Sequence, residues 1–424
     1  MARLRSSFPA LAIFCLALLV RLVYNMTVAH GYIPEFDAGF YHHIAENLLQ
    51  QHCYCVAVPV NATDRAPLWP LILTAIYFVA GVHNTYARLF LCFLGAGTCV
   101  LVYFFARELF GKRIAFFTGS IAAIYTGLFI YDGWLYSESV YTFTVTAACY
   151  SLFKLQRAWQ KRWIVAGGLF IGLASLTRPN GLFMLGLVAV WAIIVVLAKL
   201  QSWRKVFWSF VLLVLVVLAV VAPWTVRNYQ VVHTFVPVAT GSGAVLAGSY
   251  NDTTLEKNVM GLGMWIPRGS IKPRPVNMHS CCDSEADKEG AAYALHWIRA
   301  NLSKMPYLLS LHFINMWTPY TSEEGLPVRE FPTRLSSKIV WAMMQIMPVV
   351  VFILAALGLL GTWRRLRKDL LVIYLMLLLT ILVNVVFYGS MRFRAPVEPL
   401  LVLLAGGSIW WMAGRLYPFK RAML

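Results

Sequence analysis

Charged residues are scarce in this chain of 424 residues. Only 13% of the positions are Asp, Glu, Lys or Arg, whereas 60% are hydrophobic. Because soluble domains carry about 25% charged residues, this composition excludes an ordinary soluble protein. Segments of alternating hydrophobicity, which mark a membrane β-barrel, are absent as well. The sequence instead repeats apolar runs of about 20 residues, long enough for a helix to cross a bilayer. It therefore predicts an all-α, polytopic transmembrane protein.

Acidic residues are half as numerous as basic ones, 18 against 36. The basic residues form no nucleic-acid-binding module and gather at the ends of apolar runs, which marks those ends as cytoplasmic. An even number of crossings must then separate successive basic clusters. Three runs separate Arg5 from Arg107, so the short, proline-led run 67–82 is predicted to lie at the outer surface without crossing. About ten spans remain, with both termini in the cytoplasm: 8–28, 84–106, 114–131, 138–155, 163–178, 181–198, 206–223, 339–361, 369–388 and 398–414.

The predicted external parts divide the chain into three regions. An N-terminal transmembrane module (1–223) contains a first external loop (29–83), and a large external segment (224–338) precedes the C-terminal transmembrane helices (339–424). The run 8–28 has no small-residue cleavage site after it, so we interpret it as a retained span rather than a signal peptide. Amphipathic patterns predict interfacial helices over 37–49 and 285–303, the second with Ser284 and Asp287 as a capping pair. Pro306 suits the first turn of an apolar helix over 305–317.

Four of the eight cysteines fall in the predicted external segments, where disulfides can persist. Neighbouring cysteines pair poorly with each other, so we expect cross-links between the two segments. These would join Cys53 and Cys55 to Cys281 and Cys282, although the same four thiols could instead bind zinc.

Acidic residues and arginines gather on the predicted outer face. Such a group suits an anionic, lipid-linked substrate and an acid–base step. Each member also has a simpler explanation, because Asp37 and Glu138 could cap helices and the arginines could extend to lipid headgroups. The candidates are Asp37, Asp64, Arg65, Glu138, Arg227, Arg392 and Arg394.

The motifs around these residues resemble the C-type glycosyltransferase superfamily. The chain is most similar to the bacterial branch of the dolichyl-phosphate-mannose protein mannosyltransferase family, which includes lipid A aminoarabinose transferase. The motifs are Asp37 with Tyr41, Ile44-Ala45 and Asn47-Leu48-Leu49; Asp64-Arg65-Ala66-Pro67-Leu68; Leu109-Phe110-Gly111-Lys112-Arg113; Ser137-Glu138-Ser139-Val140-Tyr141; Leu176-Thr177-Arg178-Pro179-Asn180-Gly181; Pro223-Trp224-Thr225-Val226-Arg227; and Arg392-Phe393-Arg394-Ala395-Pro396-Val397-Glu398-Pro399.

This resemblance implies a membrane enzyme that moves a sugar from a polyprenyl-phosphate carrier to an acceptor hydroxyl, on the periplasmic side of a bacterial inner membrane. Asp37 would be the general base, and Glu138 the second carboxylate, which places the acceptor or stabilises positive charge on the sugar. Arg65 would hold the carrier phosphate, assisted by Arg227, Arg392 or Arg394. A single base predicts direct displacement with inversion. The acceptor would be a glycolipid, a polysaccharide or a protein.

The chain departs from the family pattern in three respects. Asp64-Arg65 replaces the family's Glu-Lys, and Asp37-Ala38 replaces a paired Asp-Glu unless Glu35 substitutes. No large soluble domain follows the predicted last span. A divalent metal near the phosphate would use Asp64 and a loop histidine such as His279.

Two other classes of protein compete with a glycosyltransferase. A flippase or transporter of lipid-linked sugars would show charged or helix-broken positions in span centres and inverted repeats. A non-catalytic membrane scaffold would not need the carboxylates and arginines. The polar residues here crowd the outer face, which favours the enzyme.

Overall fold

The computed structural model describes residues 2–256, 261–272, 284–319 and 335–416. Within these ranges the chain is helical, and its one isolated β-bridge joins Cys55 to Asn61. The α-helices are α1 (Ala2–Thr27), α2 (Phe36–Gln51), α3 (Leu68–Ala80), α4 (Asn84–Phe110), α5 (Lys112–Ile124), α6 (Thr126–Phe129), α7 (Glu138–Ala158), α8 (Lys161–Thr177), α9 (Met184–Leu197), α10 (Trp203–Val232), α11 (Ser242–Ser249), α12 (Ser284–Ala300), α13 (Met305–Trp317), α14 (Leu335–Leu366), α15 (Leu371–Val386) and α16 (Glu398–Leu416). Short 3-10 turns add η1 (Ile130–Gly133), η2 (Pro179–Phe183), η3 (Asp252–Leu255), η4 (Arg268–Ser270), η5 (Leu302–Lys304) and η7 (Met391–Val397).

Six helices in the described part of the chain are long and apolar enough to cross a membrane, and a bent pair would make seven. The predicted count of about ten spans is therefore not confirmed. Helices α8 and α15 occupy predicted spans but have only 17 and 16 residues. Helix α3 has 13 residues, which gives a length of about 20 Å, too short to cross. The six are Phe8–Thr27, Asn84–Phe110, Pro179–Leu197, Trp203–Val232, Lys338–Leu366 and Met391–Arg415.

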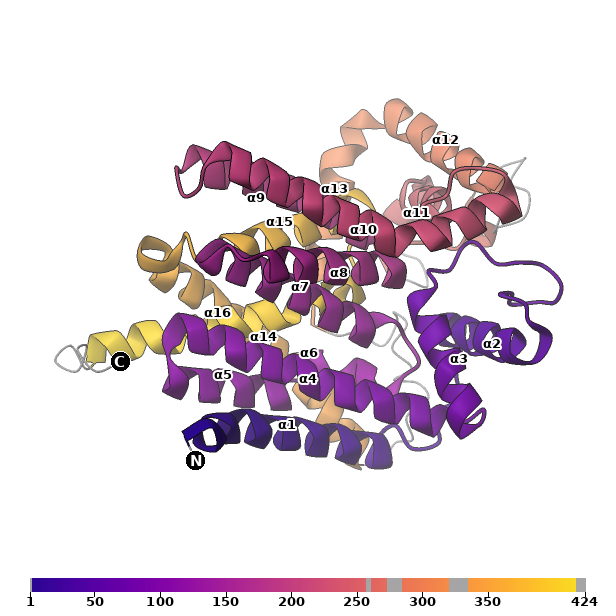
Figure 1. Cartoon of the computed structure of the whole chain (residues 1–424). Helices are drawn as coiled ribbons and strands as arrows, with labels where there is room; N and C mark the ends of the chain where they lie inside the picture. Colours follow the sequence, from indigo (N-terminus) through magenta and orange to yellow (C-terminus); the bar gives the residue numbers. More distant parts are fainter. Residues whose placement is uncertain (1, 257–260, 273–283, 320–334, 417–424) are drawn as a thin grey trace.

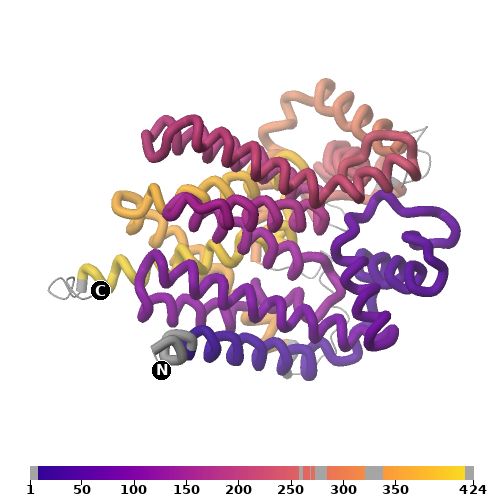
Figure 2. Tube along the Cα trace, in the orientation of Figure 1, coloured from indigo at the N-terminus to yellow at the C-terminus, as the bar shows by residue number. Residues whose placement is uncertain are grey.

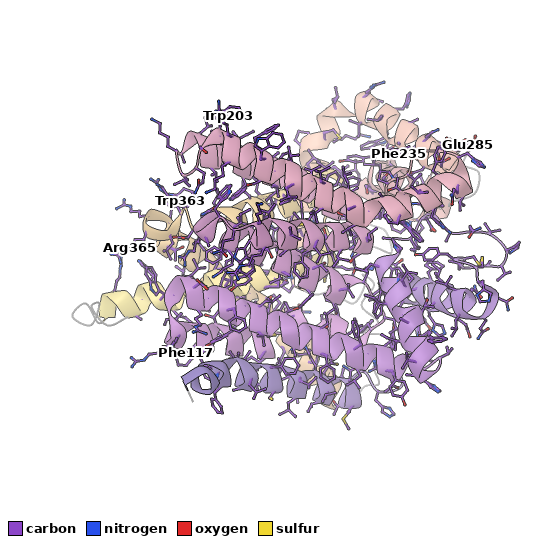
Figure 3. The ribbon with its side chains drawn as sticks, in the orientation of Figure 1. Phe117, Trp203, Phe235, Glu285, Trp363 and Arg365 are labelled. Atoms are coloured by element: carbon purple, nitrogen blue, oxygen red, sulfur yellow. A yellow bond between two sulfur atoms is a disulfide. The ribbon has the colours of Figure 1, made fainter. Side chains whose placement is uncertain are left out.

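The helices form a bundle with two distinct ends. Figure 1 shows that α1 begins and α16 ends at one end, whereas α2, α3, α11 and α12 lie at the other. Figure 3 places Trp203 and Arg365 at the first end and Phe235 and Glu285 at the second. Trp203 precedes the basic pair Arg204-Lys205, and Arg365 lies in the basic cluster 364–368. These two clusters, both predicted to be cytoplasmic, therefore lie at the end where the chain begins.

Close helix packing fixes the centre of the bundle. The main apolar core is built from α1, α4, α5, α7, α8, α9, α10, α14, α15 and α16, with residues such as Ile13, Phe105 and Leu152 almost fully buried. Helices α14 and α16 approach closely at Gly358, where an added Cβ would come 1.8 Å from the carbonyl oxygen of Leu404. A glycine at this position is what lets the two backbones meet.

The predicted span 114–131 is not one unbroken helix, because the helix breaks at Tyr125. This residue is extended (φ −73°, ψ 121°), and the segment that follows bends by 65°. Arg21 of α1 donates to the carbonyl oxygens of Ala123 (3.4 Å) and Leu128 (3.1 Å), on either side of the break. Asp132 of η1 balances the buried charge of Arg21 with an Nε–Oδ2 contact of 2.6 Å. Irregular backbone is tolerated at membrane depth only with such internal partners.

The two predicted external segments contact each other (Figure 2). The Thr240 amide donates to the Thr63 carbonyl oxygen at 2.8 Å, and Arg227 Nη1 donates to the Ala62 carbonyl oxygen at 2.8 Å. The predicted capping pair at the start of α12 is wrong. Asp287 instead accepts from the backbone amide of Gly243 and the hydroxyl of Ser242, and so ties α12 to α11.

Candidate active site

Asp37 lies in the first turn of α2, and two arginines from distant segments approach its carboxylate. Arg392 Nη1, in η7, is 2.8 Å from Asp37 Oδ2, and Arg65 Nη2, before α3, is 3.6 Å from Oδ1. The N-cap of α2 is Glu35, so capping does not explain Asp37. The Asp37 side chain is 33% exposed, the most open of these groups.

The arginines set the charge state of Asp37. Burial would raise the pKa of this carboxyl, but the charges of Arg392, Arg65 and Arg178 outweigh burial and hold the pKa below its usual value. Asp37 is therefore ionised near neutral pH.

Glu138 is the first residue of α7 and its side chain is only 1% exposed. Its Oε1 accepts from Arg178 Nη1 at 2.7 Å and from Arg392 Nε. Its Oε2 is buried and has no hydrogen-bond partner within the described ranges. Two arginine contacts to a buried carboxylate exceed what a helix cap requires, and through Arg392 they join Glu138 to the same ion-pair network as Asp37.

Arg178 joins the site without having been predicted as a site residue. It follows α8 in an extended conformation (φ −148°, ψ 132°), as expected of a residue that precedes a proline. The available signal was a lone arginine at the predicted outer end of a span, on the same face as Glu138. Its contact to Glu138 could not be read from the sequence, because the residues are 40 positions apart.

Each arginine of the site also lies over an aromatic ring. Arg392 is 4.3 Å from the ring centre of Tyr136, and Arg178 is 4.7 Å from that of Phe393. Arg65 is 4.8 Å from that of Phe40. Such contacts orient a guanidinium while leaving its edge free for anions. We call Asp37, Arg65, Glu138, Arg178 and Arg392 the acid–arginine cluster.

Two predicted carrier-phosphate ligands lie outside the acid–arginine cluster. Arg394 is fully buried, pairs with Glu398 at 2.6 Å and donates to the carbonyl oxygen of Met316. Arg227 donates to the Ala62 carbonyl oxygen and, at 3.1 Å, to Asn61 Oδ1. Both guanidinium groups contact acceptors inside the protein, and their role as phosphate ligands stays a prediction.

The described residues offer no set of ligands that supports the predicted divalent metal site. Asp64 Oδ2 pairs with Arg65 Nη1 at 2.9 Å, and no group of three or more His, Cys, Asp or Glu able to hold a metal occurs in the described ranges. His279 lies outside those ranges.

The predicted cross-links between external segments are wrong for Cys53 and Cys55, which are bonded to each other. Their Cα atoms are 5.3 Å apart, a separation that a disulfide spans without backbone movement. The same bond removes both thiols from the alternative zinc site. Cys281 and Cys282 lie outside the described residues.

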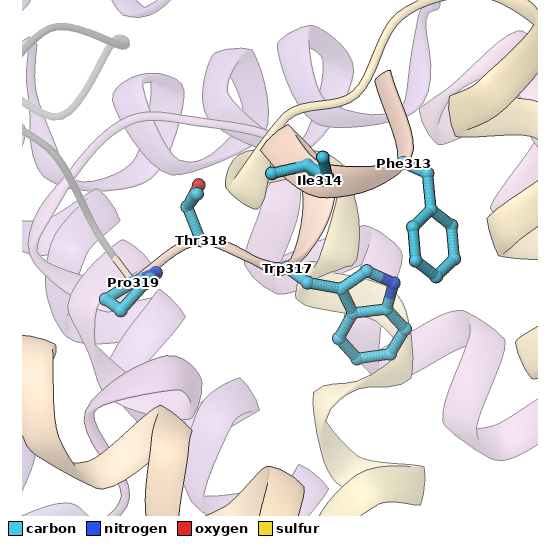
Figure 4. Close-up of a pocket in the computed structure, with 5 residues that line it drawn as sticks. All are labelled: Phe313, Ile314, Trp317, Thr318 and Pro319. Atoms are coloured by element: carbon cyan, nitrogen blue, oxygen red, sulfur yellow. The ribbon is translucent and has the colours of Figure 1, made fainter. Parts of the chain in front are cut away.

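A hollow of about 450 Å³ opens at the end of α13 (Figure 4). Its lining is Phe313, Ile314, Trp317, Thr318 and Pro319. It is almost wholly apolar, and no residue of the acid–arginine cluster lines it.

A family model matches part of the chain, and several solved structures share its fold. A family model described as dolichyl-phosphate-mannose-protein mannosyltransferase matches residues 64–226. The match contains Arg65, Glu138 and Arg178 but neither Asp37 nor Arg392. No curated protein is significantly similar to the chain in sequence.

Solved structures match over the whole described architecture. Oligosaccharyltransferase AglB from Archaeoglobus fulgidus, in complex with an inhibitory peptide and a dolichol-phosphate, matches with a TM-score of 0.60 and 14% identity over 97% of this chain and 51% of that chain. The apo form of the A. fulgidus oligosaccharyltransferase matches with a TM-score of 0.61 and 13% identity over 97% and 51%. This chain thus spans about half the length of those proteins. ArnT from Cupriavidus metallidurans, bound to undecaprenyl phosphate, matches at a lower TM-score of 0.47, with 16% identity over 99% of this chain and 81% of that chain.

Proposed function

Because the chain has the fold of the C-type glycosyltransferase superfamily, we propose that it transfers a sugar from a polyprenyl-phosphate carrier to an acceptor hydroxyl. One observation carries this proposal: a partly exposed carboxylate, Asp37, lies between two arginines from distant segments of the chain. A base beside anion-binding groups is what this transfer requires. The dolichol-phosphate bound to the archaeal oligosaccharyltransferase supports a lipid-phosphate carrier.

The reaction is a single displacement. The acceptor hydroxyl gives its proton to Asp37, and its oxygen forms a bond to the anomeric carbon. The bond from that carbon to the phosphate oxygen breaks, and the electron pair leaves with the carrier as polyprenyl phosphate. Arg65 and Arg392 stabilise the charge that develops on the phosphate. No general acid is needed, because the leaving group departs as a stable anion.

We propose inversion at the anomeric carbon, which the placement of the two carboxylates supports. A retaining reaction needs a second carboxylate placed as a nucleophile, and Glu138 is 1% exposed and held by Arg178 and Arg392. We propose that Glu138 orients these two arginines.

The cluster faces the outside of the membrane in this proposal. Asp37 lies in α2 and Arg65 lies just before α3. Helices α2 and α3 lie at the end of the bundle opposite the one where α1 begins (Figure 1). Basic residues surround that opposite end, and positive charge favours the cytoplasm. We propose a bacterial inner membrane with the site on the periplasmic side and both termini in the cytoplasm.

A transfer assay tests the function. The purified full chain in lipid nanodiscs is incubated with a panel of polyprenyl-phosphate sugars and candidate acceptors, and products are identified by mass spectrometry. Asp37→Asn should abolish transfer. Glu46→Gln is the matched control, because Glu46 lies on the same helix with a side chain that is 34% exposed, against 33% for Asp37. Full activity of Asp37→Asn would refute the assignment of the base, and movement of an uncleaved donor across the bilayer would favour a flippase.

A further inference from the structure

Arg392 is shared between two carboxylates that differ in their surroundings. Its Nε contacts Glu138, whose side chain is 1% exposed, and its Nη1 contacts Asp37, whose side chain is 33% exposed. Arg178 also donates to Glu138 Oε1, the oxygen that Arg392 contacts. The ring of Tyr136 packs against the Arg392 guanidinium and further fixes this end of the side chain. One end of Arg392 is therefore fixed, whereas the other end is held by a group that solvent and ligands can reach.

Each oxygen of the proposed base faces a guanidinium in this arrangement. Arg392 approaches Oδ2 at 2.8 Å and Arg65 approaches Oδ1 at 3.6 Å. These two guanidinium groups are also the ones that would hold the carrier phosphate. A carboxylate and a phosphate offer a guanidinium the same fork of oxygen acceptors, so the two anions compete for the same donors.

We propose that the carrier phosphate displaces Asp37 from Arg392 and Arg65, so that binding of the donor itself frees the base. This inference rests on the proposed function. Arg392 stays anchored by Glu138 while its Nη1 changes partner from Asp37 to the phosphate. The acceptor hydroxyl then meets an unpaired carboxylate only when a donor is in place, which makes the binding order donor first, acceptor second.

The same competition couples release of the carrier to the proton. Transfer leaves Asp37 protonated and neutral, and a neutral carboxyl group cannot compete with phosphate for an arginine. Loss of the proton to solvent restores the carboxylate, which pairs with Arg392 again and helps to expel the polyprenyl phosphate. Asn is a neutral replacement of similar shape, so Asp37→Asn imitates the protein just after transfer.

A binding experiment without catalysis tests the exchange. The probe is undecaprenyl phosphate, titrated into the purified full chain in nanodiscs. Asp37→Asn should bind the probe roughly threefold to tenfold more tightly than the wild type, the scale expected when one competing charge contact is lost. Asp37→Glu keeps the competing charge and should bind like the wild type, as should the control Glu46→Gln. Misfolding does not raise affinity, so a gain cannot come from a damaged protein.

The outcomes separate this inference from the proposed function. Equal or weaker binding by Asp37→Asn, in a wild-type protein that does transfer sugar, would overturn the exchange and leave the function standing. Failure of the wild type and of Glu46→Gln to bind undecaprenyl phosphate saturably would instead refute the proposed function. Tighter binding by Asp37→Asn together with loss of transfer supports both.

Discussion

Replacing Arg21 should destabilise the broken helix formed by α5 and α6, where Arg21 pairs with Asp132. Arg21 and Asp132 are 0% and 1% exposed, and Arg21 also donates to the carbonyl oxygens of Ala17, Ala123 and Leu128. Arg21→Met would leave the Asp132 charge buried without its cation and three carbonyl groups without this donor. Breaking a buried ion pair by removing one partner costs about 3–5 kcal/mol.

Labelling of Cys99 is the direct assay. Cys99 is buried and its sulfur is 3.5 Å from Arg21 Nη2, so this thiol becomes reactive when the region opens. The purified protein is heated with a thiol reagent, and labelling of the Cys99 peptide is followed by mass spectrometry. Cys15 is exposed and is replaced by Ser in every variant to keep the background low. The midpoint of labelling should fall sharply in Arg21→Met.

A matched surface pair provides the control for this prediction. Arg157 and Asp369 are 2.9 Å apart, but their side chains are 33% and 30% exposed. Arg157→Met should therefore cost only about 0–1 kcal/mol. The double variant Arg21→Met with Asp132→Asn should lose less stability than the sum of the single changes, because the two residues interact. A midpoint for Arg21→Met no lower than that of Arg157→Met would refute the reasoning.

Three further predictions concern pH, the second arginine of η7 and helix packing. Since arginines hold the pKa of Asp37 below its usual value of about 3.9, kcat/KM for the donor should fall only as pH drops through that lowered pKa. Arg392→Gln should move the fall to higher pH, and an unmoved profile would contradict this. Arg394→Lys should lower the thermal midpoint yet leave affinity for undecaprenyl phosphate unchanged; weaker binding would return Arg394 to the phosphate site. Gly358→Ala should destabilise the protein by about 1–3 kcal/mol, measured by thermal unfolding, whereas Gly186→Ala should not, because no atom lies within 4 Å of a Cβ added there.

Local sequence patterns predicted the bounds of two helices, α2 and α13, well. The amphipathic pattern over 37–49 lies within α2, and Pro306 in the first turn marked the start of α13, which the structure gives as Met305–Trp317. Both signals depend on neighbouring residues. The break at Tyr125 has no comparable local signal, because Tyr125 itself is neither Gly nor Pro and the nearby Gly127 lies within helix α6. Its stability comes from Arg21, more than a hundred positions away.

The candidate site was predictable in its residue types but not in its contacts. Arg392 and Arg394 are two positions apart and were both expected to hold phosphate. They lie in the 3-10 turn η7, where three residues complete a turn, so residues two apart point in different directions. One therefore reaches Asp37, and the other is buried against Glu398. Only the backbone conformation of η7 separates their roles.

The cluster also explains why a site for an anion contains carboxylates. Three arginines that converge without a ligand would repel one another, and Asp37 and Glu138 offset this repulsion while the site holds no carrier. The two carboxylates cannot be equivalent, because one is buried and bonded to two arginines while the other is one-third exposed. Displacing Glu138 would leave a buried charge without partners, which is costly, whereas a displaced Asp37 is hydrated at once. The incoming phosphate therefore exchanges with Asp37, and the carboxylate that yields is the one that the transfer reaction needs as a base.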